Sequence, residues 1–192
     1  FYRVSNNFWN DKDNRIKYIK WLENKLNITK AEDWYYKLTG NIIRDNYGGQ
    51  LLNKYNGSPI KIIKDLCNPP EEDGEWLEWK FENTPIPVDF WIYKNRIRWF
   101  KWLENKLNIT KPVDWYDKFE TQIIVNNFGG HLLTNYYYNH KPLELLKDLC
   151  DPPEEDGEWL VWKFTSCFNN LYTKECIIKW FKWLENKLNI TK

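Results

Sequence analysis

The decapeptide Trp21-Leu-Glu-Asn-Lys-Leu-Asn-Ile-Thr-Lys30 recurs unchanged at residues 102–111 and again at 183–192, each time 81 residues further along the chain. Gly48-Gly49 returns at the same offset as Gly129-Gly130. Residues 65–77 return almost unchanged at 148–160, and an insertion of two residues near 136–141 explains this larger offset. A fixed period of this length is the signature of tandem structural repeats. The sequence therefore predicts repeats of about 81 residues.

The segment that leads into each decapeptide has helical periodicity. Ile16, Ile19, Leu22 and Leu26 follow one another at steps of three or four residues, which places them on one face of a helix over 13–28. Thr29 followed by Glu32 has the spacing of a capping box and predicts the start of a second helix. In the second copy, Pro112 takes the corresponding place near the helix start.

Three further helices are predicted in each copy. Ile42 and Ile43 belong to a third, and Gly48-Gly49 separates it from a fourth that holds Leu51 and Leu52. The glycines predict either a turn with positive φ or a close approach of helices. Ser58-Pro59 has the sequence of an N-cap and first helical residue, and it opens a fifth helix. Because no segment alternates in the manner of a strand, we expect an all-α fold with about five short helices per repeat.

These boundaries divide the chain into five parts. We expect helical repeat 1 at 8–81, a linker at 82–89, helical repeat 2 at 90–164 and a second linker at 165–171. Residues 172–192 then form the first helix of a truncated third repeat, which we expect to pack on repeat 2. Both ends of the sequence have the appearance of a cut within a longer repeat protein or assembly.

Composition and cysteine spacing limit the kind of protein. Hydrophobic residues make up 42% of the chain, and no apolar run approaches the roughly 18 residues of a membrane span, so we expect no membrane partner. With two His and no C-x-x-C spacing, no metal site is expected. Cys167 and Cys176 either pair or remain free thiols. Four unpaired thiols are typical of a reducing compartment, which favours an intracellular location.

No catalytic constellation is evident. The densest carboxylate cluster, Glu71 to Glu75, lies in a Pro/Gly loop that we expect to be solvated, whereas acid–base pairs need environments that separate their pKa values. The sequence therefore predicts a protein that is not an enzyme, with no cofactor and no small-molecule substrate. The Asn-x-Thr triplets at Asn27, Asn108 and Asn189 are interpreted as helix ends rather than glycosylation sites.

Tryptophan is unusually frequent, with 13 residues. Because each indole buries on the order of 200 Å², recurrence at equivalent positions indicates packing. We expect the exceptions to be Trp76 and Trp79, which follow the acidic loop. The predicted structural core comprises Trp21, Trp34, Trp102, Trp115 and Trp183.

Charge and a helix-turn-helix pattern point to nucleic acid. The two acidic loops hold nine of the 27 acids, which leaves 18 acids against 28 Lys and Arg in the rest of the chain. Such a basic body suits phosphate binding, and it suits helix-to-loop contacts equally well. The segment 41–55, with its central glycines, fits a helix-turn-helix. The predicted nucleic-acid contacts are Arg44, Gln50, Asn53, Lys54, Lys61 and Lys64 in repeat 1, and Asn126, His131, Thr134, Asn135 and Lys141 in repeat 2.

Four motifs carry a resemblance to known proteins. They are Trp-Leu-x-x-Lys-Leu-x-Ile, Asp-Trp-Tyr at 33–35 and 114–116, Gly-Gly-x-Leu-Leu, and Trp-Leu-x-Trp-Lys-Phe. Together they resemble a widespread family of tandem Trp-rich helical repeat proteins, largely uncharacterised. The stretch 51–66 is more loosely similar to helix-turn-helix repeats associated with homing endonucleases, from which Pro59 and the two-residue insertion depart. That second resemblance implies DNA binding.

Two functions from different classes follow. The first is a non-enzymatic tandem-repeat module that binds nucleic acid, DNA in particular, through basic helix-turn-helix faces. The second is a protein–protein interaction or structural scaffold array, in which the helices pack against neighbouring repeats or partner subunits. Both predict the same fold, but only the first predicts binding that weakens steeply with salt.

Overall fold

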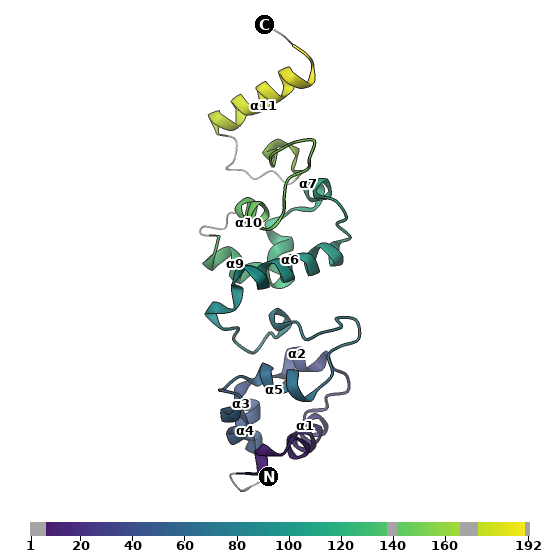
Figure 1. The fold of residues 1–192 in the computed structure, drawn as a ribbon, viewed down its shortest axis with the longest axis vertical. Helices are drawn as coiled ribbons and strands as arrows, with labels where there is room; N and C mark the ends of the chain where they lie inside the picture. Colours follow the sequence, from purple (N-terminus) through teal and green to yellow (C-terminus); the bar gives the residue numbers. More distant parts are fainter. Residues whose placement is uncertain (1–6, 138–141, 166–172, 191–192) are drawn as a thin grey trace. The chain divides into compact units, whose positions relative to one another are not determined.

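In the computed structural model the chain is helical, and it divides into two compact units, Phe1–Phe90 and Trp91–Lys192 (Figure 1). The structure describes residues 7–137, 142–165 and 173–190. Within these ranges no residue lies in a β-strand, which confirms the predicted all-α class.

Unit 1 is built from short helices that follow one another closely. Its longest helix, α1, has 15 residues, and η2 is a π-helical kink between α3 and α4. The elements are η1 (Phe8–Asn10), α1 (Lys12–Leu26), α2 (Asp33–Lys37), α3 (Gly40–Ile43), η2 (Arg44–Gly48), α4 (Gly49–Lys54), α5 (Pro59–Leu66) and η3 (Glu78–Lys80).

Unit 2 has the same order of elements except for an additional 3-10 helix, η5, and it ends with one further helix, α11. Its first helix, α6, also has 15 residues. The elements are η4 (Val88–Trp91), which begins in unit 1, then α6 (Tyr93–Leu107), η5 (Pro112–Asp114), α7 (Trp115–Lys118), α8 (Thr121–Ile124), η6 (Val125–Gly129), α9 (Gly130–Asn135), α10 (Pro142–Leu149), η7 (Val161–Lys163) and α11 (Lys174–Lys187).

Local sequence explains where α1 and α6 end. Asn27 and Asn108 follow the two helices with φ of 51° and 52°, the left-handed conformation that asparagine tolerates well. Asn189 has φ of 53° just after α11. All three asparagines of the Asn-x-Thr triplets therefore lie at helix ends, as the sequence predicts.

The start of α2 differs from the prediction. Glu32 makes no side-chain cap, so the expected capping box with Thr29 is wrong. Asp33 replaces it, since one carboxylate oxygen accepts hydrogen bonds from the backbone N–H of Thr29 at 2.8 Å and of Lys30 at 3.2 Å. Asp114 makes the equivalent bonds in unit 2. The Asp33 carboxylate, one residue after Glu32, reaches the backbone amides of both Thr29 and Lys30, whereas the Glu32 side chain caps neither. The predicted Ser58 cap of α5 is confirmed.

The buried aromatic core also differs from the expected one. Trp34 and Trp115 are buried, but Trp21, Trp102 and Trp183 are only partly buried. Trp76 and Trp79, the expected exceptions, are buried instead. The cause is the tail after the acidic loop, which folds back onto α2. Trp76 lies 5.4 Å from Tyr35, centroid to centroid, and donates its indole N–H to the Cys67 carbonyl.

The paired glycines allow a close approach rather than a positive φ. A Cβ on Gly48 would lie 2.3 Å from the Tyr18 hydroxyl oxygen, whereas a Cβ on Gly49 would meet nothing within 4 Å. Gly129 stands equally close to Trp99. The positive φ of this kink belongs to Tyr47, at 67°. Gly48 therefore lets the α3–α4 kink lie directly against α1.

Candidate nucleic-acid interface

The predicted helix-turn-helix corresponds to α3, the η2 kink and α4. Its proposed contact side chains in unit 1 are all exposed. However, α4 has only six residues, which at 1.5 Å per residue makes it about 9 Å long. A helix this short presents fewer than two turns to a DNA groove. The six exposed residues are Arg44, Gln50, Asn53, Lys54, Lys61 and Lys64.

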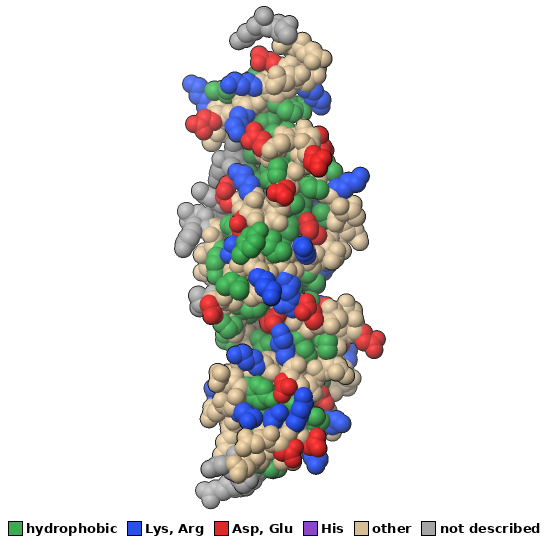
Figure 2. All heavy atoms as spheres, in the orientation of Figure 1, with side chains coloured by type: hydrophobic (Ala, Val, Ile, Leu, Met, Phe, Trp, Pro, Cys, Tyr) green, Lys and Arg blue, Asp and Glu red, His purple; other side chains and the backbone are tan. Residues whose placement is uncertain are grey.

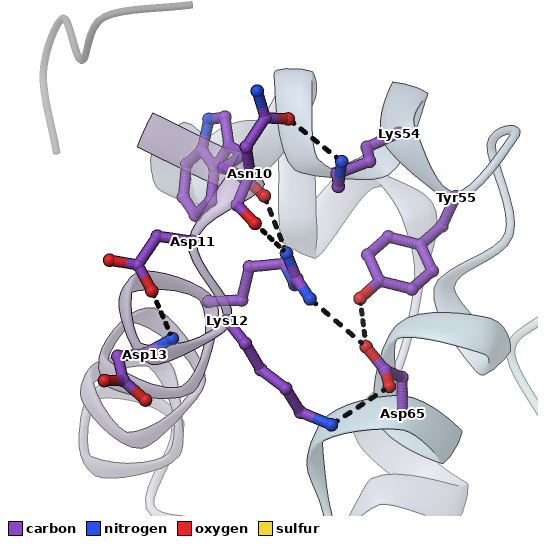
Figure 3. Close-up of polar contacts among 9 residues, drawn as sticks. Asn10, Asp11, Lys12, Asp13, Lys54, Tyr55 and Asp65 are labelled. Atoms are coloured by element: carbon purple, nitrogen blue, oxygen red, sulfur yellow. Dashed lines mark hydrogen bonds and ion pairs between the residues drawn. The ribbon is translucent and has the colours of Figure 1, made fainter. Parts of the chain in front are cut away.

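Several of these side chains already have partners within unit 1. Lys54 donates a hydrogen bond to the side-chain oxygen of Asn10 at 3.1 Å, and Figure 3 shows it pointing toward that residue. Lys64 forms an ion pair with Glu78. Arg44 donates to the Asn41 side chain at 3.0 Å. Binding a phosphate with these groups would therefore first require breaking internal contacts.

Beside Lys54, Asp65 is the centre of a polar network (Figure 3). Its carboxylate accepts a hydrogen bond from the Tyr55 hydroxyl at 2.5 Å and forms ion pairs with Lys12 and Arg15. The bond from Tyr55 is the main cause that lowers the pKa of Asp65. Unit 2 repeats the arrangement, since Asp148 accepts from Tyr137 and pairs with Arg96. The network joins the end of α4 to α1 and α5, which indicates a structural role.

In unit 2 the proposed contacts are less basic. Val125 and Glu144 stand where unit 1 has Arg44 and Lys61. The Asn135 and His131 side chains hydrogen-bond to each other at 2.8 Å, and Thr134 bonds to backbone carbonyls of its own helix. Asn126 is exposed and accepts from Gln122. Lys141 lies outside the described residues. The helix-turn-helix surface is thus not a feature that the two units share.

The acidic loop is only partly solvated. Glu71, Glu72 and Glu75 are exposed, as expected, but Asp73 has 5% side-chain exposure. It accepts hydrogen bonds from the Tyr35 hydroxyl at 2.9 Å and from Lys80 at 2.6 Å. Asp156 has the same two kinds of partner in unit 2. Part of the acidic charge therefore holds the loop to its own unit.

A different basic surface is shared, and it lies on the first helix of each copy. Lys20 and Lys25 on α1 have equivalents on α6 and α11, and all six are exposed. Within the described residues none of them forms an ion pair with a carboxylate. Figure 2 shows Lys and Arg side chains interspersed with acidic ones on the face that it presents. We call this set the first-helix basic face: Lys20, Lys25, Lys101, Lys106, Lys182 and Lys187.

Each pair of lysines flanks a partly buried tryptophan. The Lys25 ammonium lies 5.2 Å from the Trp21 ring centroid, Lys106 lies 5.1 Å from Trp102, and Lys187 lies 4.7 Å from Trp183. Such a cation–π contact orients the second lysine of each pair along the helix surface, whereas the first lysine stands five residues earlier, about 140° away around the helix. The recurrence of these tryptophans in the sequence predicts a place in the core, and for that reason it does not predict the basic face. The signal that could have found it is the unchanged Lys-Trp-Leu-Glu-Asn-Lys spacing in all three copies.

The structure offers little for cysteine or metal chemistry in the part of the chain that it describes. A pocket between α1, α2 and α5 contains Glu23, Trp34 and Cys67. Burial raises the pKa of Cys67 to about 12, so the group is a thiol at neutral pH rather than a nucleophilic thiolate. Among the described residues no cluster of three His, Cys, Asp or Glu side chains could hold a metal ion. Cys176 is a free cysteine in the structure, and Cys167 lies outside the described residues.

None of the helices in the described ranges is long and apolar enough to span a membrane. Comparison of the chain with protein-family models, with curated protein sequences and with solved structures finds no match in any of the three. The resemblance to tandem Trp-rich repeat proteins therefore stays a prediction that rests on the quoted motifs.

Proposed function

We propose that the chain is a non-enzymatic array of tandem helical repeats that binds nucleic acid through the first-helix basic face. The observation that carries this proposal is the recurrence of two exposed lysines at the same positions of α1, α6 and α11, for which the described part of the chain shows no carboxylate partner. A surface that recurs in every copy suits a ligand that is itself periodic. The phosphate backbone of DNA or RNA is such a ligand.

The chemistry of the face favours phosphates over base edges. Lysine ammonium groups act as point charges, and phosphate contacts of this kind supply affinity without sequence information. Where one nucleic acid reaches more than one copy, avidity adds to the affinity of a single patch. We therefore expect binding that is weakly selective for sequence and strongly dependent on salt.

The helix-turn-helix surface is the weaker candidate for the same ligand. Its lysines in unit 1 are partly engaged, and two of its basic positions become Val125 and Glu144 in unit 2. Specific base recognition by this segment would thus be confined to unit 1. This ranking can be tested because the two surfaces share no residue.

The test compares two triple charge reversals in the full chain. One variant carries Lys20→Glu, Lys101→Glu and Lys182→Glu on the first-helix basic face. The matched control carries Arg44→Glu, Lys54→Glu and Lys61→Glu on the helix-turn-helix surface. Each lowers the net charge from +1 by the same amount, so a difference between them reports on position and not on total charge.

Binding to duplex DNA and to single-stranded RNA is measured at about 50 and 200 mM salt. The first-helix variant is expected to lose most of its affinity, and the slope of log K against log salt falls by about three because three phosphate contacts are gone. The control variant keeps the slope of the unaltered chain. If only the control variant loses binding, the helix-turn-helix hypothesis is correct. If the unaltered chain does not bind at the lower salt, the chain is not a nucleic-acid-binding protein.

A further inference from the structure

Helix α11 carries the same apolar pattern as α1 and α6 but lacks their cover. Trp180, Phe181 and Leu184 lie 81 residues after Trp99, Phe100 and Leu103. Phe100 is 2% exposed, whereas Phe181 is 54% exposed. Likewise Ile109 is 8% exposed and its equivalent Ile190 is 57% exposed. The difference lies in what surrounds the helix, since the decapeptide itself is identical.

In unit 2 the segment that follows α6 covers this face. The Trp115 ring stacks on Phe100 with centroids 5.0 Å apart, and its indole N–H donates to Glu104 at 3.2 Å. The Trp99 indole N–H donates to the Asn127 carbonyl at 2.8 Å, directly beside Gly129. The cover of α6 is therefore the segment from α7 through the η6 kink.

The same segment also closes the C-terminal end of α6. The Lys118 ammonium donates to the backbone carbonyl of Leu107 at 2.7 Å, one of the last carbonyls of the helix. In unit 1, Lys37 makes the same bond to Leu26 at 2.9 Å. A segment that covers a helix of this kind must therefore supply an indole, a lysine and a glycine kink, in the order of Trp115, Lys118 and Gly129.

The contacts of α11 involve another side of the helix. Trp183 lies 6.0 Å from Trp162, centroid to centroid, and Lys179 pairs with Glu158 at 2.9 Å. A cavity of about 390 Å³, lined by Trp162, Cys176, Ile177 and Trp180, remains between α11 and η7. These contacts hold the helix but leave its apolar face exposed, including Ile177, Ile178, Phe181 and Leu188.

We propose that this exposed face of α11 is a docking surface for a helical segment with the chemistry of α7 to α10. In unit 2 such a segment follows Ile109-Thr110-Lys111, the end of the decapeptide that recurs unchanged at 183–192. Its tryptophan stacks on Phe181, its glycine kink admits Trp180, and its lysine caps the last carbonyls of α11. This inference concerns protein packing and does not depend on nucleic-acid binding.

The test appends a copy of residues 112–165 after Lys192 and follows amide hydrogen exchange by mass spectrometry. In the 192-residue chain, the amides of α11 are expected to exchange faster than those of α6, because the apolar face of α11 is exposed whereas that of α6 is buried. In the extended chain, exchange in α11 slows by roughly tenfold or more. A matched extended chain with Phe181→Ser loses this protection, while α1 and α6 keep theirs.

Three results would overturn the proposal. One is an extended chain whose α11 exchanges as before. Another is an appended segment that stays unfolded, because α11 should supply its missing first helix. The third is strong protection of α11 in the 192-residue chain that rises with protein concentration, which would assign the face to a second copy of the chain.

Discussion

At the scale of single residues, the two adjacent glycines of the kink have different surroundings. Gly48 lies against Tyr18 and Ile43, and a Cβ there would stand 2.3 Å and 2.7 Å from atoms of these side chains. Gly49 faces open space and has helical φ and ψ of −57° and −41°. Sequence position alone does not distinguish them, but the packing does.

We predict that Gly48→Ala destabilises unit 1 by about 2 kcal/mol, since the added methyl overpacks a rigid contact. Gly49→Ala is the matched control and should raise stability by about 0.5 kcal/mol, because alanine loses less conformational entropy in a helix. Urea denaturation of each variant, followed by circular dichroism, measures both. Equal effects of the two substitutions would show that the kink does not pack against α1 as described.

A second prediction at the scale of residues concerns how the free energy of unfolding changes at acidic pH. Hydrogen bonds from the amides of Thr29 and Lys30 lower the pKa of Asp33 below its ordinary value. The stabilisation is therefore complete above the unfolded pKa of about 4 and is lost as the pH falls through the lower folded pKa. With Asp33→Asn, the free energy of unfolding should fall less steeply as the pH drops below about 4. Glu32→Gln, which removes a neighbouring carboxylate outside these bonds, should leave the acid profile unchanged when thermal unfolding is measured against pH.

At the scale of elements, α2 anchors the acidic loop and the tail that follows it. The Tyr35 hydroxyl donates to Asp73 and accepts from the Leu77 N–H at 3.2 Å, which ties three segments to one buried group. Burial raises the pKa of Tyr35, so the phenol stays protonated and keeps donating at neutral pH. Tyr116 repeats both contacts in unit 2.

We predict that Tyr35→Phe costs about 1–3 kcal/mol, because the substitution removes one of the two partners of the buried Asp73 carboxylate and leaves the buried Leu77 N–H without its partner. Tyr36→Phe is the control, since the Tyr36 side chain is 56% exposed. Tryptophan fluorescence during denaturation reports the loss, and Trp76 should become more exposed to solvent in the first variant alone. A Tyr35→Phe chain as stable as the control would contradict the anchoring role.

Sequence periodicity predicts most of the helices but not how the tail folds. Apolar spacing and the Ser58-Pro59 cap place α1 and α5 correctly, since both depend on local chemistry. The burial of Trp76 depends on contacts with Tyr35, about 40 residues away, which no local pattern reports. The same limit explains why the sequence predicts a core position for Trp21 that the structure does not show. Its ring is large and recurrent, but its neighbours leave part of it exposed.

At the scale of the whole molecule, the copies of the repeated sequence share two surface features, and neither of them is the predicted helix-turn-helix site. The first is the first-helix basic face, whose exposed lysines recur on α1, α6 and α11. The second is an apolar helix face that is covered on α1 and α6 and open on α11. The helix-turn-helix positions, by contrast, vary between the units. We therefore propose that nucleic acid binds to the long helices and not to the helix-turn-helix positions.

The measurement that tests this claim most directly is lysine footprinting of the full chain with duplex DNA at about 50 mM salt. Exposed lysines are acetylated with and without excess DNA, and mass spectrometry gives the reactivity of each one. If the first-helix basic face binds DNA, Lys54 and Lys61 keep their reactivity and DNA protects the six lysines of that face: Lys20, Lys25, Lys101, Lys106, Lys182 and Lys187. Protection confined to Lys54 and Lys61, or protection of no lysine at all, would contradict it.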